Sequence, residues 1–213
     1  RSGPIFAEWL TTDEAATMHR TFEESLRFPE PTSIVDILVF KRDKANRFVE
    51  AWRTRIDPKN QFIDRSIPPL QTAIEIEHNG DPTTKVDLLM LGDGYTAAEC
   101  AAKFKKDTRR MADALFAVEP YKSRRKDFNV WGICPPSAKS GISRPSTGFY
   151  NATPVGATYD VFGAERYVLT MNNRAFRNIS SWAPYEFVEL LVNNETYGGG
   201  GLYNVFAPAA GDN

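Results

Sequence analysis

The chain has 213 residues, of which 42% are hydrophobic, and its 26 lysines and arginines nearly balance its 27 acidic residues. This balance excludes the strong basic excess typical of nucleic-acid-binding domains, and no apolar run is long enough to cross a bilayer. The length allows one large domain or two smaller ones.

The first third of the chain is rich in β-type segments. Residues 20–28 mix aromatic and charged side chains, and residues 34–40 and 48–56 are β-rich runs. The charged residues 41–47 separate the last two runs, which predicts the exposed tip of an antiparallel hairpin. Two or three strands bury too little surface to be stable alone. We therefore expect residues 1–68 to be part of a β-sandwich, or to lean on the next domain.

The pattern changes after Pro68-Pro69 to that of an α/β domain. Residues 72–77 alternate in polarity, as a strand with one buried face does. Residues 86–91 and 128–134 are nearly continuous apolar runs, which are typical of strands covered on both faces.

A helix is predicted between the two apolar strands. Thr96 followed by Glu99 forms a capping box, which marks the start of a helix. The order strand, helix, strand implies a right-handed crossover and a parallel strand pair. The side chains expected on one face of this helix are those of Cys100, Phe104, Met111 and Leu115.

The last third of the chain contains one long irregular segment. Residues 137–158 are rich in Ser, Gly, Pro, Thr and Asn, and loops of this length in compact domains are often functional. Residues 164–179 are predicted to be a helix that Asn172-Asn173 interrupts. Residues 187–192 are predicted to be the next buried strand.

Four consecutive glycines, Gly198 to Gly201, follow Tyr197 shortly after this strand. Glycine is costly in ordered backbone and adds no side-chain packing. Such a run inside a folded domain indicates that a phosphate, a peptide or another strand approaches the main chain closely. The alternative is a mobile loop.

Gly92-Asp93-Gly94 lies between a strand and a helix, where α/β proteins bind anions. The segment lacks the third glycine of a dinucleotide fingerprint, and Asp93 would repel a phosphate. A tight turn from strand to helix therefore explains these glycines better. Helix capping and cation binding are both open as roles for Asp93.

The residues do not assemble a catalytic site. A nucleophilic serine needs a base, and the two histidines, His19 and His78, lie in no metal-binding or triad pattern. We therefore assign no catalytic and no metal-ligating residue. Cys100 and Cys134 have no metal-ligand spacing. We expect two buried free thiols, with a single disulfide as the alternative.

Several segments carry a family resemblance when they are taken together. They are residues 86–96, then 127–130 with Pro136-Ser137 and Ser140-Gly141, then 191–193 with Tyr197 and the glycines. In this order and spacing they resemble the bacterial IgA-peptidase-type zinc metallopeptidases. Residues 6–9 through 55–58 look like the later strands of the β-sandwich that precedes the peptidase domain in that family.

The resemblance implies a fold and an activity. Residues 69–213 would be the N-terminal half of a zincin-like, three-layer α/β catalytic domain, and residues 1–68 the C-terminal part of a β-sandwich domain. The implied activity is zinc-dependent hydrolysis of a peptide or protein substrate, with no nucleic-acid partner and no membrane span. The implied setting is secreted or periplasmic. Which protein is the substrate, and the oligomeric state, are not implied.

The resemblance also implies where the metal chemistry lies. In the family, a His-Glu-x-x-His helix that follows the glycine run binds zinc and supplies the general base. This sequence contains no such motif. We therefore expect the chain to be an inactive fragment, with zinc bound by residues outside it.

The resemblance gives the glycine run a role in substrate binding. In zinc peptidases of this architecture, the strand before the metal-binding helix often forms the sheet edge with which an extended substrate pairs. We therefore predict that the substrate contacts Tyr197, Gly198, Gly199, Gly200 and Gly201. Two alternatives stay open. One is a non-catalytic surface module for glycans or proteins, and the other a small-ligand domain with an anion site at residues 92–96.

Overall fold

The computed structural model describes residues 9–19, 28–65, 73–202 and 205–210. Contacts between residues divide the chain into two compact units. One is Leu26–Ile67, and the other is Pro68–Asn213 together with Arg1–Ser25. The strand-like segment predicted over residues 20–28 lies, except for Phe28, outside the described residues.

The smaller unit contains a β-hairpin. Strands β1 (Val35–Arg42) and β2 (Phe48–Ile56) pair antiparallel, as the sequence predicts. The Asp43 carboxylate closes the turn because it accepts hydrogen bonds from the main-chain nitrogens of Ala45 and Arg47. The hairpin prediction is confirmed, whereas the assignment of residues 1–68 to a β-sandwich stays a prediction.

The two faces of the hairpin differ in chemistry. Because side chains alternate along a strand, Asp36 and Arg55 lie opposite each other on one face and form an ion pair at 2.9 Å. The other face is mostly apolar. It carries Val35, Ile37, Val39, Trp52 and Ile56, together with Thr54.

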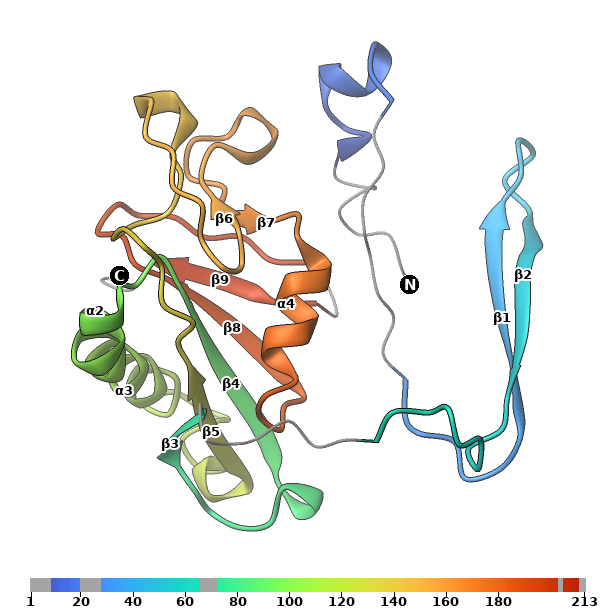
Figure 1. Cartoon of the computed structure of the whole chain (residues 1–213), viewed down its shortest axis with the longest axis horizontal. Coiled ribbons are helices and arrows are strands. Elements are labelled where there is room, and N and C mark those ends of the chain that lie inside the picture. Colours follow the sequence, from blue (N-terminus) through green and yellow to red (C-terminus); the bar gives the residue numbers. More distant parts are fainter. Residues whose placement is uncertain (1–8, 20–27, 66–72, 203–204, 211–213) are drawn as a thin grey trace. The chain divides into compact units, whose positions relative to one another are not determined.

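The larger unit is built on a five-stranded mixed sheet (Figure 1). Its order is β3-β5-β4-β8-β9, and β3 runs antiparallel to its neighbour while the other four strands are parallel. The parallel pairing predicted for β4 and β5 is confirmed. The strands are β3 (Ala73–Glu77), β4 (Val86–Asp93), β5 (Phe128–Ile133), β8 (Phe187–Val192) and β9 (Ala207–Ala210).

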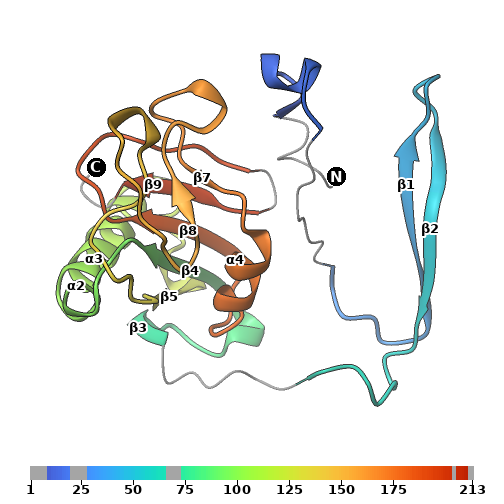
Figure 2. The same ribbon diagram turned by 45° about the horizontal axis from the view of Figure 1, so that its top comes forward.

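Apolar side chains on both faces of the central strands explain why helices cover both faces. Leu88 and Met90 of β4 pack in a cluster with Phe104 of α3 (Lys103–Leu115). Leu89 of β4 points to the opposite face and packs in a cluster with Phe176 of α4 (Asn173–Ser180). Figure 2 shows the sheet between α3 and α4. The α/β architecture is therefore confirmed, and its zincin-like character stays a prediction.

The predicted helix after β4 is divided in two. Thr96 caps α2 (Ala97–Ala101), and the capping box with Glu99 is confirmed. Ala102 leaves the helical conformation, with φ −125° and ψ −67°, so α3 begins as a separate helix. The expected apolar face is confirmed, because Cys100, Phe104, Met111 and Leu115 all pack in the same cluster.

The helix predicted over residues 164–179 is wrong in its first half. Only α4 is helical there, and Leu169–Thr170 instead forms β7, which pairs antiparallel with β6 (Ala157–Thr158). The Asn172 side chain accepts a hydrogen bond from the main-chain nitrogen of Ala175 and so caps α4. The asparagine pair therefore starts the helix rather than interrupting it.

The predicted long irregular loop over residues 137–158 is confirmed, with helical or strand structure only in η5 (Pro145–Thr147) and β6. Short 3-10 helices lie in the connecting segments. They are η1 (Asp13–Ala16), η3 (Pro82–Thr84), η4 (Arg125–Asp127), η5 (Pro145–Thr147) and η6 (Val161–Gly163).

The two cysteines form a disulfide, so the expectation of free thiols is wrong. The bond joins Cys100 in α2 to Cys134, which directly follows β5, across 34 residues of sequence. Packing of α2 beside the end of β5 brings the two Cα atoms within 5.6 Å, a distance that disulfides commonly span.

The disulfide predicts a measurable stabilisation. Replacing both Cys100 and Cys134 with Ser should lower the free energy of unfolding by about 3–4 kcal/mol, because closing a loop of this length restricts the unfolded chain. Urea unfolding of the variant and of the parent chain measures the difference. The parent chain treated with a reductant is the matched control and should unfold like the variant. Two titratable thiols in the unreduced, unfolded parent chain would contradict the disulfide.

Candidate functional site

The glycine run lies beside the edge strand β9. Gly199 bridges Ala209 of β9 in antiparallel orientation and Tyr167 in parallel orientation. Its main-chain nitrogen donates to the carbonyl of Arg166 at 3.0 Å, and its carbonyl accepts from the nitrogen of Val168 at 3.1 Å. The main chain that approaches Gly199 closely is therefore another part of this same chain.

Packing explains two of the four glycines. A Cβ atom on Gly198 would collide with the ring of Tyr159, and one on Gly200 would lie 2.8 Å from Cε2 of Tyr167. A Cβ atom on Gly201, in contrast, would meet no atom of the described residues within 4 Å. The first two positions exclude larger side chains for internal reasons, whereas Gly201 faces open space.

The predicted substrate contacts therefore divide into two kinds. Tyr197 is 65% exposed, and Gly200 and Gly201 are exposed as well, so all three are accessible to a ligand. Gly198 is buried, and the main chain of Gly199 is already hydrogen-bonded. The assignment of Tyr197 to Gly201 to substrate binding stays a prediction, and the exposed positions are its best places for a test.

Tyr159 supports the residues just before the glycines. Its buried ring packs against Gly198, and its hydroxyl donates to the carbonyl of Thr196 at 2.7 Å. Burial raises the pKa of Tyr159 to about 12, against the opposing effect of Arg144. The hydroxyl therefore stays protonated at neutral pH and serves as a donor.

Asp93 ends the central strand β4 and holds the long loop. Its buried carboxylate accepts hydrogen bonds from the Thr153 hydroxyl at 2.7 Å and from the main-chain nitrogen of Ala157 at 2.8 Å. Burial raises the pKa of Asp93, and these hydrogen bonds oppose the rise. The possible role of Asp93 as a helix cap is wrong, because Thr96 caps α2.

The turn after β4 confirms the structural interpretation of its glycines. Gly94 has φ +80°, and a Cβ atom there would lie 2.8 Å from the main chain of Gly141. The nitrogen of Gly141 donates to the carbonyl of Gly94 at 2.8 Å. Glycine is therefore needed for the turn and for the close approach of the long loop.

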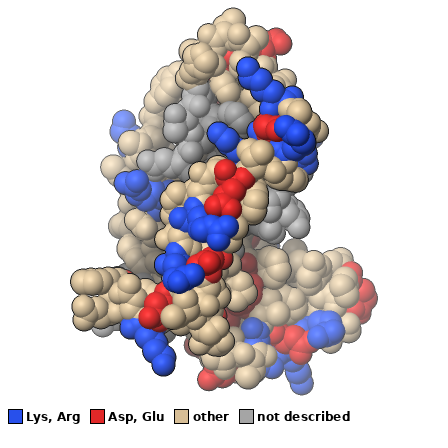
Figure 3. Space-filling model, turned by 90° about the vertical axis from the view of Figure 1, so that its right-hand side faces the viewer, with Lys and Arg blue, Asp and Glu red and all other residues tan. Residues whose placement is uncertain are grey.

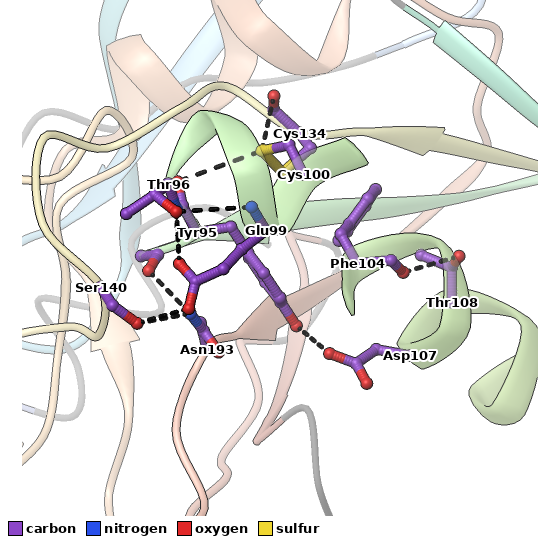
Figure 4. The surroundings of a disulfide bond; sticks show 11 residues. Tyr95, Thr96, Glu99, Cys100, Phe104, Asp107, Thr108, Cys134, Ser140 and Asn193 are labelled. Atoms are coloured by element: carbon purple, nitrogen blue, oxygen red, sulfur yellow. Dashed lines mark hydrogen bonds between the residues drawn. A yellow bond between two sulfur atoms is a disulfide. The ribbon is translucent and has the colours of Figure 1, made fainter. Parts of the chain in front are cut away.

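Glu99 joins three segments at this end of the sheet (Figure 4). Its carboxylate accepts from the main-chain nitrogen of Thr96 at 2.8 Å and from the Ser140 hydroxyl at 2.7 Å. The Asn193 amide donates to that hydroxyl at 3.0 Å. Burial disfavours ionisation of Glu99, but the hydrogen bonds outweigh it and hold the pKa at about 2. Glu99 is thus an ionised structural acceptor.

The residues do not fit a catalytic zinc site. Within the described residues, no group of three or more His, Cys, Asp and Glu side chains is arranged to hold a metal ion. His19 is exposed, His78 lies 3.7 Å from Glu75, and both cysteines are consumed by the disulfide. Such a donor set lacks the three protein ligands that catalytic zinc requires.

The surface carries charges of both signs. On the face that Figure 3 shows, the side chains of Lys and Arg are interspersed with those of Asp and Glu. Among the described residues, no helix is both long enough and apolar enough to span a membrane.

Comparison with protein-family models gives two matches. The model described as IgA Peptidase M64 matches residues 74–213, and the model described as Peptidase M64 N-terminus matches residues 3–53. The chain belongs to the IgA Peptidase M64 family. The resemblance predicted from the sequence is therefore confirmed. A search of curated proteins found no match.

The two family models match different segments of the chain. The peptidase model begins within β3 and extends over the whole mixed sheet and the glycine run. The N-terminal model covers β1 and most of β2.

Sequence reasoning did not single out Arg144 and Tyr159, which lie near the glycines. In the sequence they are marked only as a cationic residue within the irregular loop and an aromatic residue directly after it.

The glycine geometry predicts different costs for two matched substitutions. Gly198→Ala should lower the free energy of unfolding by about 1–3 kcal/mol, because the new methyl group overpacks against Tyr159. Gly201→Ala should change it by less than about 0.5 kcal/mol, because the position is open. Thermal or urea unfolding measures both variants, and equal effects at the two positions would show that the packing argument is wrong.

Glu189 predicts a pH dependence of stability. It lies in β8 between Met90 and Ala207, without a hydrogen-bond or ion-pair partner in the part of the chain that the structure describes. Burial raises its pKa from 4.5 to about 8. The folded state therefore holds this proton more tightly than the unfolded state, so stability should fall as pH rises from 5 to 8.

The test compares Glu189→Gln with the parent chain across this range. The parent should lose about 1–3 kcal/mol more than the variant between pH 5 and pH 8, since glutamine cannot ionise. Urea unfolding at each pH gives the values. Glu195→Gln, which removes an exposed carboxylate, is the control and should follow the parent. Parallel pH profiles for the parent and Glu189→Gln would contradict the prediction.

Proposed function

We propose that this chain forms the scaffold and part of the substrate-binding surface of a zinc-dependent metallopeptidase that hydrolyses peptide bonds in proteins or peptides. The observation that carries the proposal is the match of the M64 peptidase model to residues 74–213. The mixed sheet, with a glycine run beside its edge strand, supports it. In this proposal residues 69–213 are half of a zincin-like domain and residues 1–68 part of a β-sandwich.

The proposal places the zinc ligands and the general base outside this sequence. The chain has two histidines and no His-Glu-x-x-His motif, and its described side chains do not fit a zinc site. Its own contribution is to position the substrate. Tyr197, Gly200 and Gly201 are the exposed members of the segment that would contact an extended peptide.

The proposed location is outside the cytoplasm, either secreted or periplasmic. The disulfide between Cys100 and Cys134 supports this, since disulfides form and persist mainly in oxidising compartments. The bond also links α2 covalently to the end of β5, so it has a structural role in the fold.

The function is tested by comparing two forms of the protein. The chain of 213 residues should neither retain stoichiometric zinc after dialysis nor cleave a fluorogenic peptide library. A form that also carries a His-Glu-x-x-His helix should cleave it, and a zinc chelator should abolish that cleavage. Readdition of zinc to the chelated form should restore the activity. Chelator-insensitive cleavage by either form would contradict the proposal, and glycan binding without any cleavage would favour a binding module.

A further inference from the structure

Arg144 is a partly buried cation whose positive charge is only weakly balanced by nearby carboxylates of the protein. Its side chain is 25% exposed, and it comes from the long loop over residues 137–158. The Nε atom is buried and has no hydrogen-bond partner among the described residues. Among the described residues, the carboxylate that pairs with it is that of Glu165, 3.9 Å from Nη2, and the Glu165 side chain is 77% exposed.

This environment leaves the charge of Arg144 poorly neutralised. An ion pair with an exposed partner at such a distance contributes little, because solvent screens it and the long side chains lose entropy. Removing a guanidinium from water is costly unless it is well paired. A ligand carboxylate would reduce this cost by accepting hydrogen bonds from the two Nη atoms, since Arg binds carboxylates through two parallel hydrogen bonds and its Nε atom is buried here.

Arg144 is held in a fixed position beside the glycine run. Its Nη1 atom donates to the hydroxyl of Thr196 at 3.2 Å, and its Cζ atom lies 5.6 Å from the ring centroid of Tyr159. The same ring packs against Gly198. Thr196 directly precedes the exposed Tyr197. The guanidinium is therefore adjacent to the segment proposed to contact the substrate.

We propose that Arg144 is a specificity-determining residue that binds a carboxylate of the peptide substrate. This proposal rests on the proposed peptidase function and deepens it by naming the chemical class of substrate: a peptide with an acidic group near the glycine run. The carboxylate comes either from an Asp or Glu side chain or from the C-terminus of the peptide. Both offer the same chemistry to the guanidinium.

The test measures binding, so it does not depend on catalysis. Fluorescence anisotropy gives Kd values for the chain with labelled peptides that differ in one group. One pair exchanges Glu for Gln at successive positions, and another exchanges a free C-terminus for an amide. Wild-type chain should bind the carboxylate form about 10-fold more tightly, which corresponds to one charge-assisted contact. The pair that shows the difference identifies the source of the carboxylate.

Matched variants separate recognition from a structural role. Arg144→Met should abolish the preference for the carboxylate peptide. Arg144→Lys should retain a smaller preference, since lysine keeps the charge but cannot form two parallel hydrogen bonds. Thr196→Val removes the hydrogen bond to Arg144 without removing the charge, so it should keep the preference. A preference that persists in Arg144→Met, or an equal loss of affinity for both members of a pair in that variant, would overturn the proposal, because Arg144 would then not distinguish the carboxylate.

The outcomes also separate this proposal from the peptidase function. Equal Kd values for the members of both peptide pairs, or no binding of any peptide, would overturn the role of Arg144. Neither result would contradict the peptidase function, because the cleavage assay tests that function separately through its dependence on zinc. Circular dichroism of each variant verifies that the comparison is made between folded proteins.

Discussion

The buried carboxylate of Asp93 is the constraint on which the rest of the larger unit depends. It ends the central strand β4 and binds the hydroxyl of Thr153 and the main chain of Ala157, so the long loop is fixed against the sheet. That loop in turn carries Arg144 and leads into Tyr159, which packs against Gly198. The proposed substrate-contacting surface is therefore positioned by hydrogen bonds made at the end of a strand, in keeping with the usual location of ligand sites in parallel sheets.

The sequence predicts the features of the fold that depend on local patterns. The apolar runs of β4 and β5 identify strands with two buried faces, and their parallel pairing follows from the helix between them. The capping box at Thr96 is local as well, because both of its partners lie within one turn. The family resemblance is also carried by sequence order, and the peptidase model confirms it over residues 74–213.

Features that depend on contacts between distant segments could not be predicted in the same way. The pairing of Cys100 with Cys134 requires α2 to pack beside the end of β5, which no local pattern encodes. The false helix over residues 164–172 arose because β7 is only two residues long and its partner β6 is equally short. The glycine run indicated a close approach correctly, but the sequence alone did not show that Tyr159, Val168 and Tyr167 are the groups that approach.

The packing of Gly198 against Tyr159 has a consequence for how such a protein changes over evolution. A Cβ atom at position 198 would collide with both Tyr159 and Val168, so a larger residue there becomes acceptable only when those two side chains become smaller or move. Such positions should vary together among relatives, whereas Gly201 should vary independently because no described residue lies within 4 Å of a Cβ atom added there. If glycine is nevertheless invariant at position 201 across many relatives, binding of a partner rather than folding would explain its conservation.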